Sequence, residues 1–124
     1  MNKMQEHFLR MSLKPVVESD LPGRLRIGFA HFNLLPGEAK PYLHYIYDVL
    51  QMLPGVTRVR INERIGTILI QYDGSCCTSQ RVLQWVDTVV DTGIELAGER
   101  DWQPSDEKLL EKIMRDRLSA RLPR

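Results

Sequence analysis

The side chains that could bind a metal ion are few and far apart in this sequence. Cys76 and Cys77 are the only cysteines, and adjacent thiols are poorly placed to bond to each other or to converge on one ion. His31 lies at the end of a predicted strand, but one imidazole without neighbouring thiolates or carboxylates makes a weak site. His44 and Asp48 share one face of a predicted helix, and two ligands are too few. We expect these groups to be structural, with iron or haem ligation by His31 as the alternative.

Four arginines form the strongest local pattern. Each alternates with apolar residues along one of two predicted strands, so all four should point to the same side of a sheet. They are Arg24, Arg26, Arg58 and Arg60. The pattern is typical of a solvated face with ion pairs, in which Glu95 would pair with Arg24 or Arg26, or of a docking surface for an anionic partner. Sheet-face RNA binders need exposed aromatic side chains, and Tyr72 should point inward, so nucleic acid is not expected.

The sequence lacks a recognisable catalytic arrangement. Its Pro36-Gly37 and Asp73-Gly74 pairs are isolated turns rather than a glycine-rich phosphate loop. We find no sequence pattern that would supply a nucleophile, a base and a group that orients the base. We therefore predict a protein that is not an enzyme.

Composition places further bounds on function. The chain has 124 residues, of which 43% are hydrophobic and 27% charged, as expected for one globular domain. Its formal net charge of +1 gives no global attraction to nucleic acid or membranes. The cysteine usage favours a reducing compartment, and no signal peptide or membrane span is expected. We predict a cytoplasmic protein that reaches a membrane only through a partner.

Periodicity predicts the elements that position these residues. Residues 1–20 are weakly patterned and are interpreted as an N-terminal tail. Alternation predicts strands over 24–32, 56–61 and 67–72 and a weaker one over 94–98. Helical spacing predicts helices over 38–53 and from Thr78 or Ser79 to Gly93. The resulting βαββαβ order predicts an α+β ferredoxin-like fold over residues 21–98, with a four-stranded antiparallel sheet in the order 4-1-3-2.

A further amphipathic helix is predicted within residues 99–124. Ser105 would cap it, with acidic residues in its first turn. Its apolar stripe includes Leu110, Ile113 and Met114. This C-terminal helix should either fold back on the domain or mediate self-association, which would make the protein a homo-oligomer.

Three segments together resemble the heavy-metal-associated domain family, in its divergent branch without the cysteine pair. They are Leu21-Pro22-Gly23-Arg24-Leu25-Arg26-Ile27, Leu53-Pro54-Gly55-Val56-Thr57-Arg58-Val59 and Gly66-Thr67-Ile68-Leu69-Ile70-Gln71-Tyr72-Asp73. The loop over 31–37 has no Cys-x-x-Cys, so thiolate-mediated metal transfer is not expected there. Members of the family accompany or form part of P-type metal-transporting ATPases. Some members without the cysteine pair carry an Arg-x-Arg in the first strand, as residues 24–26 do here, and are associated with iron handling.

The resemblance implies a non-enzymatic accessory module in metal homeostasis, with iron as the first candidate. Its partner would be a P-type ATPase or a related assembly, docked on Arg24, Arg26, Arg58 and Arg60. The alternatives are an iron- or haem-binding module that uses His31 and a self-associating structural protein that uses the C-terminal helix.

Overall fold

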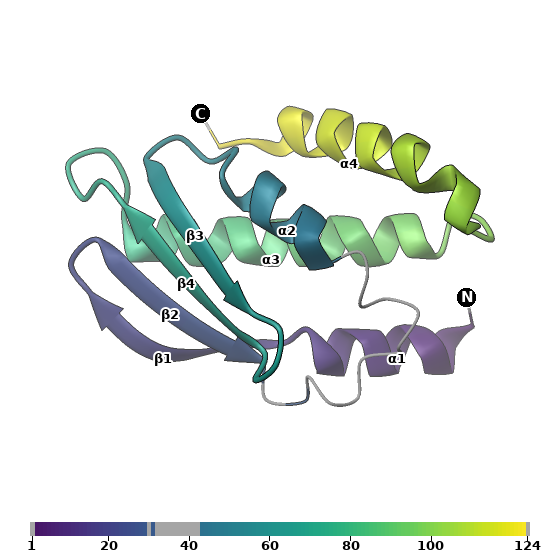
Figure 1. The fold of residues 1–124 in the computed structure, drawn as a ribbon, viewed down its shortest axis with the longest axis horizontal. Coiled ribbons are helices and arrows are strands. Elements are labelled where there is room, and N and C mark those ends of the chain that lie inside the picture. The colour runs from purple at the N-terminus through teal and green to yellow at the C-terminus, as the bar shows by residue number, and fades with distance from the viewer. Residues whose placement is uncertain (1, 30, 32–42, 124) are drawn as a thin grey trace.

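Four strands form one antiparallel sheet in the computed structural model, which describes residues 2–29, 31 and 43–123. The strands are β1 (Pro15–Leu21), β2 (Arg24–Phe29), β3 (Val56–Asn62) and β4 (Thr67–Tyr72), in the spatial order β1-β2-β4-β3. The helices are α1 (Lys3–Ser12), α2 (Leu43–Leu50), α3 (Ser79–Ala97) and α4 (Glu107–Arg121), the last preceded by a short 3-10 helix over Pro104–Asp106. Figure 1 shows α3 lying between α1 and α4. The predicted α+β class, the four-stranded ferredoxin-like sheet and the C-terminal helix are confirmed.

One side of the sheet forms the core with the helices. Alternate strand residues are buried there, from Leu25 and Ile27 on β2 to Ile68, Ile70 and Tyr72 on β4. Helix α3 packs Trp85 against this layer, and the indole Nε1 donates a hydrogen bond of 3.0 Å to the Val49 carbonyl of α2. The alternation predicted for the strands now labelled β2, β3 and β4 is therefore confirmed, because a period of two places every second side chain in the core.

The sheet edge beside β2 differs from the prediction. Residues 94–98 were expected to supply this strand, but β1 occupies the position, and residues 94–97 belong to α3. β1 and β2 form a hairpin through Pro22 and Gly23, where Gly23 has a φ of 73°. Proline followed by a residue with positive φ suits a type II turn. The interpretation of residues 1–20 as a tail is therefore wrong for α1 and β1.

Gly93 does not end α3, contrary to the prediction. The helix continues to Ala97, and Gly98 caps it by donating its backbone N–H to the carbonyls of Ile94 and Glu95. Gly93 instead faces α4, where a β-carbon on it would lie 3.7 Å from the Met114 Cε atom. Ile94 and Leu96 are both buried, which explains why an apolar alternation over a few residues resembled a strand.

Helix α4 folds back on the helix layer rather than on the sheet. Leu118 is completely buried in the core cluster, and Met114 packs against that cluster. Before α4, the Trp102 Nε1 atom donates a 2.7 Å hydrogen bond to the Leu96 carbonyl at the end of α3. Among the described helices, none packs on the other side of the sheet (Figure 1). In the described part of the chain, no helix has the length and apolarity that crossing a bilayer requires.

Candidate functional site

The four predicted arginines lie on the open side of the sheet in two rows that cross three strands. In the first row Gln71 of β4 separates Arg24 from Arg58, and in the second Leu69 separates Arg26 from Arg60. Two strand spacings put the α-carbons within a row about 10 Å apart, and the rows lie about 7 Å from each other. We call this surface, made of the four arginines with Leu69 and Gln71, the arginine face.

All four arginine side chains are exposed, whereas Leu69 and Gln71 between them are half-buried. Within the described residues, none of the four takes part in an ion pair; the salt bridges found there lie on the helices and their connections. The predicted pairing of Glu95 with Arg24 or Arg26 is wrong, because Glu95 lies on α3. The arginine face is thus a concentrated positive patch whose charge is left for solvent or a partner.

One carboxylate lies close to this patch, at a β-bulge in β1. The register of β1 on β2 shifts between Val17 and Ser19, so Glu18 is the extra residue. Its carboxylate lies directly over Gly28, where a β-carbon would need the same space. Gly28 follows Arg26 by two positions and therefore shares its side of β2. Glu18 thus sets one border of the arginine face.

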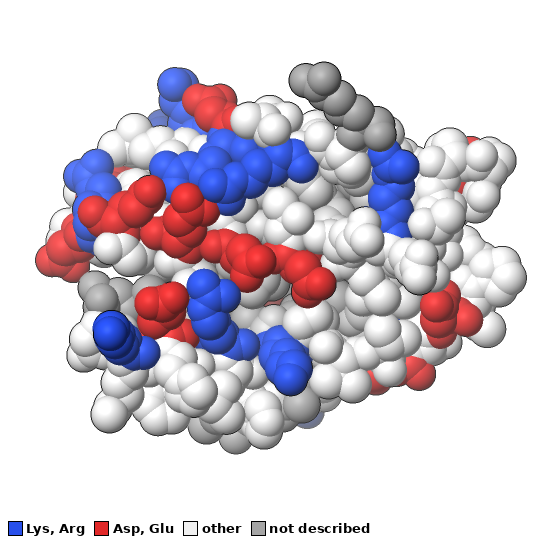
Figure 2. Space-filling model, turned by 180° about the vertical axis from the view of Figure 1, so that it is seen from behind, with Lys and Arg blue, Asp and Glu red and all other residues white. Residues whose placement is uncertain are grey.

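Two acidic side chains of α3, Asp91 and Glu95, form ion pairs within the protein, unlike the arginines of the sheet. Figure 2 shows a band of acidic side chains with basic side chains on both sides. Arg10 of α1 binds Asp91 at 3.2 Å, and Arg121 of α4 binds Glu95 through two nitrogens at 2.7 and 3.1 Å. The hydrogen bond from Arg121 holds the pKa of Glu95 below its ordinary value. These contacts fasten α1 and α4 to α3.

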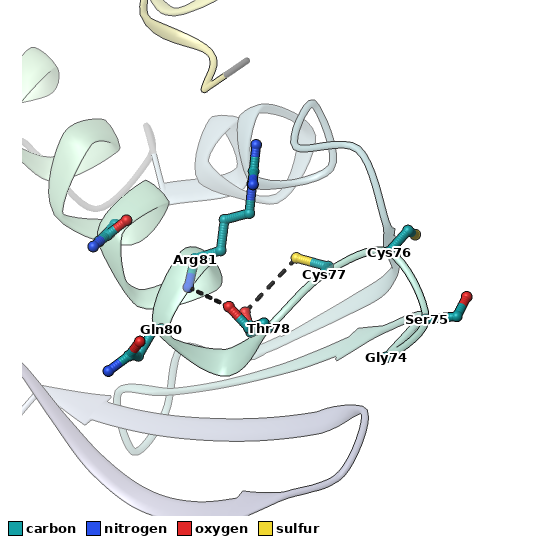
Figure 3. Close-up of a pocket in the computed structure, with 8 residues that line it drawn as sticks. Gly74, Ser75, Cys76, Cys77, Thr78, Gln80 and Arg81 are labelled. Carbon is teal, nitrogen blue, oxygen red and sulfur yellow. Dashed lines mark hydrogen bonds between the residues drawn. The ribbon is translucent and has the colours of Figure 1, made fainter.

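The cysteine pair lies just before the start of α3. Cys77 is buried and Cys76 exposed, and Figure 3 shows their sulfurs pointing in different directions. The Cys77 thiol donates to the Thr78 carbonyl at 3.7 Å, and burial raises its pKa. Thr78 accepts the Arg81 N–H as the helix cap. The predicted packing role beneath the helix start agrees with this geometry for Cys77 but not for Cys76, which is exposed. An open hollow of about 350 Å³ lies beside the pair, and none of the described residues forms a metal-binding group there.

The histidines do not assemble a site with other ligands in the described residues. His31 is exposed in a turn, and its assignment as an iron or haem ligand stays a prediction. Asp48 forms an ion pair with Arg115 of α4 at 3.6 Å, while the side chain of His44 lies outside the described residues. Among those residues, no group of three or more histidine, cysteine, aspartate or glutamate side chains could hold a metal ion.

The residues predicted to mediate self-association lie on α4. Leu110, Ile113 and Met114 are half-buried, because this face of the helix packs on α3 and α2. Self-association through the remaining exposed area stays a prediction.

The sequence reasoning found the arginines but missed Glu18 and the strand that carries it. A signal was present in the β-prone run over 15–21, which leads through Pro-Gly into the next strand and is typical of a hairpin.

No protein-family model, curated protein or solved structure matches this chain.

Proposed function

We propose that this protein is a non-enzymatic docking module that binds an acidic segment of a protein partner through the arginine face. One observation carries the proposal: four exposed guanidinium groups stand in two cross-strand rows, without an ion pair among the described residues. Guanidinium groups bind carboxylates through paired hydrogen bonds, so a patch of four selects an acidic surface. The positive charge is local, because the whole chain carries only +1.

A protein partner is favoured over a nucleic acid by the placement of the aromatic side chains. In the described strands the aromatic residues are Phe29 and Tyr72, and both are less than 10% exposed on the core side. Proteins that bind single-stranded nucleic acid on a sheet use exposed aromatics for base stacking. Carboxylates need no such platform.

The resemblance to heavy-metal-associated domains supplies a more specific form of the proposal. The partner would be a P-type metal-transporting ATPase or a related assembly, and the process would be metal homeostasis, with iron first among the metals. The module would work in the cytoplasm and reach the membrane through that partner. This form rests on the sequence segments that carry the resemblance, chiefly the Arg-x-Arg of β2.

A capture experiment with charge-reversed variants tests the proposal. The double variant Arg24→Glu/Arg26→Glu should retain its fold, because both side chains are exposed, and should lose a protein captured by the wild type. The matched control Lys3→Glu/Lys108→Glu reverses two exposed lysines on α1 and α4 and changes the net charge equally. Capture that survives in the arginine variant, or that is lost equally in the lysine control, would contradict the proposal.

A further inference from the structure

Among the described strands, none pairs with the outer edge of β3, which could therefore accept an additional strand. β3 ends the sheet on one side, so half of its backbone N–H and C=O groups point away from β4. Its pairing with β4 is regular over residues 58–62, after a bulge at Thr57. The opposite edge is less suitable, because β1 begins with a proline and is interrupted by the bulge at Glu18.

A shallow, open groove lies between β3 and α2 at this edge. Val59, Arg60 and Ile61 line it from the strand, Tyr47 and Asp48 line it from the helix, and Glu63 lies beyond the strand's end. Three consecutive strand residues have side chains on both sides of the sheet, so the groove follows the edge itself. Its volume is about 600 Å³.

The two sides of this edge differ in chemistry. On the open side Arg58 and Arg60 belong to the arginine face, whereas on the helix side Ile61 is half-buried and Tyr47 is 40% exposed. Asp48 is paired with Arg115, so its charge is offset within the chain. A strand placed here would meet guanidinium groups with one set of its side chains and an apolar, aromatic surface with the other.

We propose that the acidic partner binds as a fifth strand along residues 58–62, with acidic and apolar side chains in alternation. Its acidic side chains would lie beside Arg58 and Arg60, and its apolar side chains would enter the groove at Tyr47 and Ile61. The charge of the arginines selects the occupant, and the backbone of β3 supplies hydrogen bonds as in other cases of β-augmentation. This inference rests on the proposed function and names the form in which the partner binds.

Peptide binding to the 124-residue chain tests the added strand. The probe is a labelled peptide in which glutamate alternates with valine over about six residues, a common strand length. We expect Arg60→Glu to weaken binding by about fivefold or more, because an attractive cross-strand pair becomes repulsive. Tyr47→Lys should also weaken binding, while Lys108→Glu on α4 should leave it unchanged.

Two altered peptides separate strand addition from simple charge attraction. Methylating alternate backbone nitrogens removes the hydrogen bonds to β3 but keeps every carboxylate, and should abolish binding. A peptide of the same composition with its glutamates grouped together should bind more weakly than the alternating one. Equal binding of the methylated peptide would overturn strand addition and leave charge-based docking intact. Equal loss of capture in the lysine control would instead overturn charge-based docking, and with it the acidic occupant proposed here.

A second copy of the chain is the competing occupant of this edge. Light scattering should show a monomer whose mass is unchanged in Glu18→Lys. A larger mass that falls to the monomer in Glu18→Lys would place the β1 strand of another copy on β3 and overturn the proposal.

Discussion

The Glu18 carboxylate lies over the α-carbon of Gly28 and fills the space that a β-carbon there would need. The contact brings a negative charge to the side of β2 that carries Arg24 and Arg26. It exists because β1 is bulged at Glu18 and because residue 28 has no side chain. A bulge can re-aim a side chain in this way. Through Glu18, the edge strand β1 therefore affects the charge of the arginine face.

Removing the charge of Glu18 should therefore strengthen binding of acidic ligands. We expect Glu18→Gln to bind an acidic peptide about two- to fivefold more tightly, as measured by fluorescence anisotropy, because an exposed charge contributes up to about 1 kcal/mol. Asp20→Asn is the matched control, since Asp20 pairs with the core-side residue Leu25 and faces away from the arginines. Equal affinities for Glu18→Gln and wild type would show that Glu18 does not modulate this face.

Gly55 should tolerate no side chain. Its φ is 100°, and a β-carbon would lie 2.7 Å from the Cys77 Cβ atom. Gly55→Ala adds backbone strain to a clash with a buried side chain, so its free energy of unfolding should fall by about 2–4 kcal/mol in urea denaturation. Gly74→Ala, in open space, should change it by less than about 1 kcal/mol. Similar losses in both variants would be contrary to this packing.

The pH dependence of stability should separate two acidic residues of α3. The pKa of Glu95 is lowered by its hydrogen bond from Arg121 and by the charges of Arg121 and Arg117. A lowered folded-state pKa stabilises the fold above the unfolded-state value, and this contribution disappears as the pH falls through the folded-state pKa. Glu95→Gln should therefore be less stable than wild type at neutral pH and equally stable in strong acid.

Asp87 provides the control, because its pKa is shifted in the opposite direction to that of Glu95. Burial, and then the charge of Asp91, raise the pKa of Asp87. A raised folded-state pKa favours the fold below the unfolded-state value, and that advantage is lost as the pH rises through the folded-state pKa. Asp87→Asn should therefore be more stable than wild type at neutral pH, with the difference vanishing below about pH 4. Urea denaturation across this range checks both variants, and shifts of the same sign would contradict the assignment.

The helical conformation of residues 93–97 can be tested at Gly93. In a helix interior, alanine is more favourable than glycine by about 0.5–1 kcal/mol. The 3.7 Å approach to Met114 leaves room for one methyl group. We expect Gly93→Ala to raise the free energy of unfolding by that amount, whereas Gly93→Leu should lower it by displacing α4. Destabilisation by alanine would argue against a continuous α3.

The same glycine shows where sequence reasoning stopped being sufficient. Glycine commonly follows the end of a helix, so Gly93 with Ile94 and Leu96 after it predicted a turn and a strand. The packing of α4 on α3, which makes a small residue useful at Gly93, involves residues some twenty positions away. No local pattern contains that information.

Strands β2, β3 and β4 were predictable because one side of each is buried. Alternation fixes the side of every residue, which gave the correct positions of Arg24, Arg26, Arg58 and Arg60. The bulge at Glu18 depends on the register of β1 against β2, and the groove at Tyr47 depends on how α2 packs beside β3. These features follow from pairing and packing, so they emerged only from the structure.

An NMR titration of the isotope-labelled full chain with an acidic peptide tests the docking role of the arginine face most directly. We expect the side-chain Nε–H signals of Arg24, Arg26, Arg58 and Arg60 to shift together with the backbone amides of β2, β3 and β4. Added salt should weaken these shifts, because the pairs are exposed. Shifts confined to α1, α3 and α4, with the four arginine signals unmoved, would contradict the account.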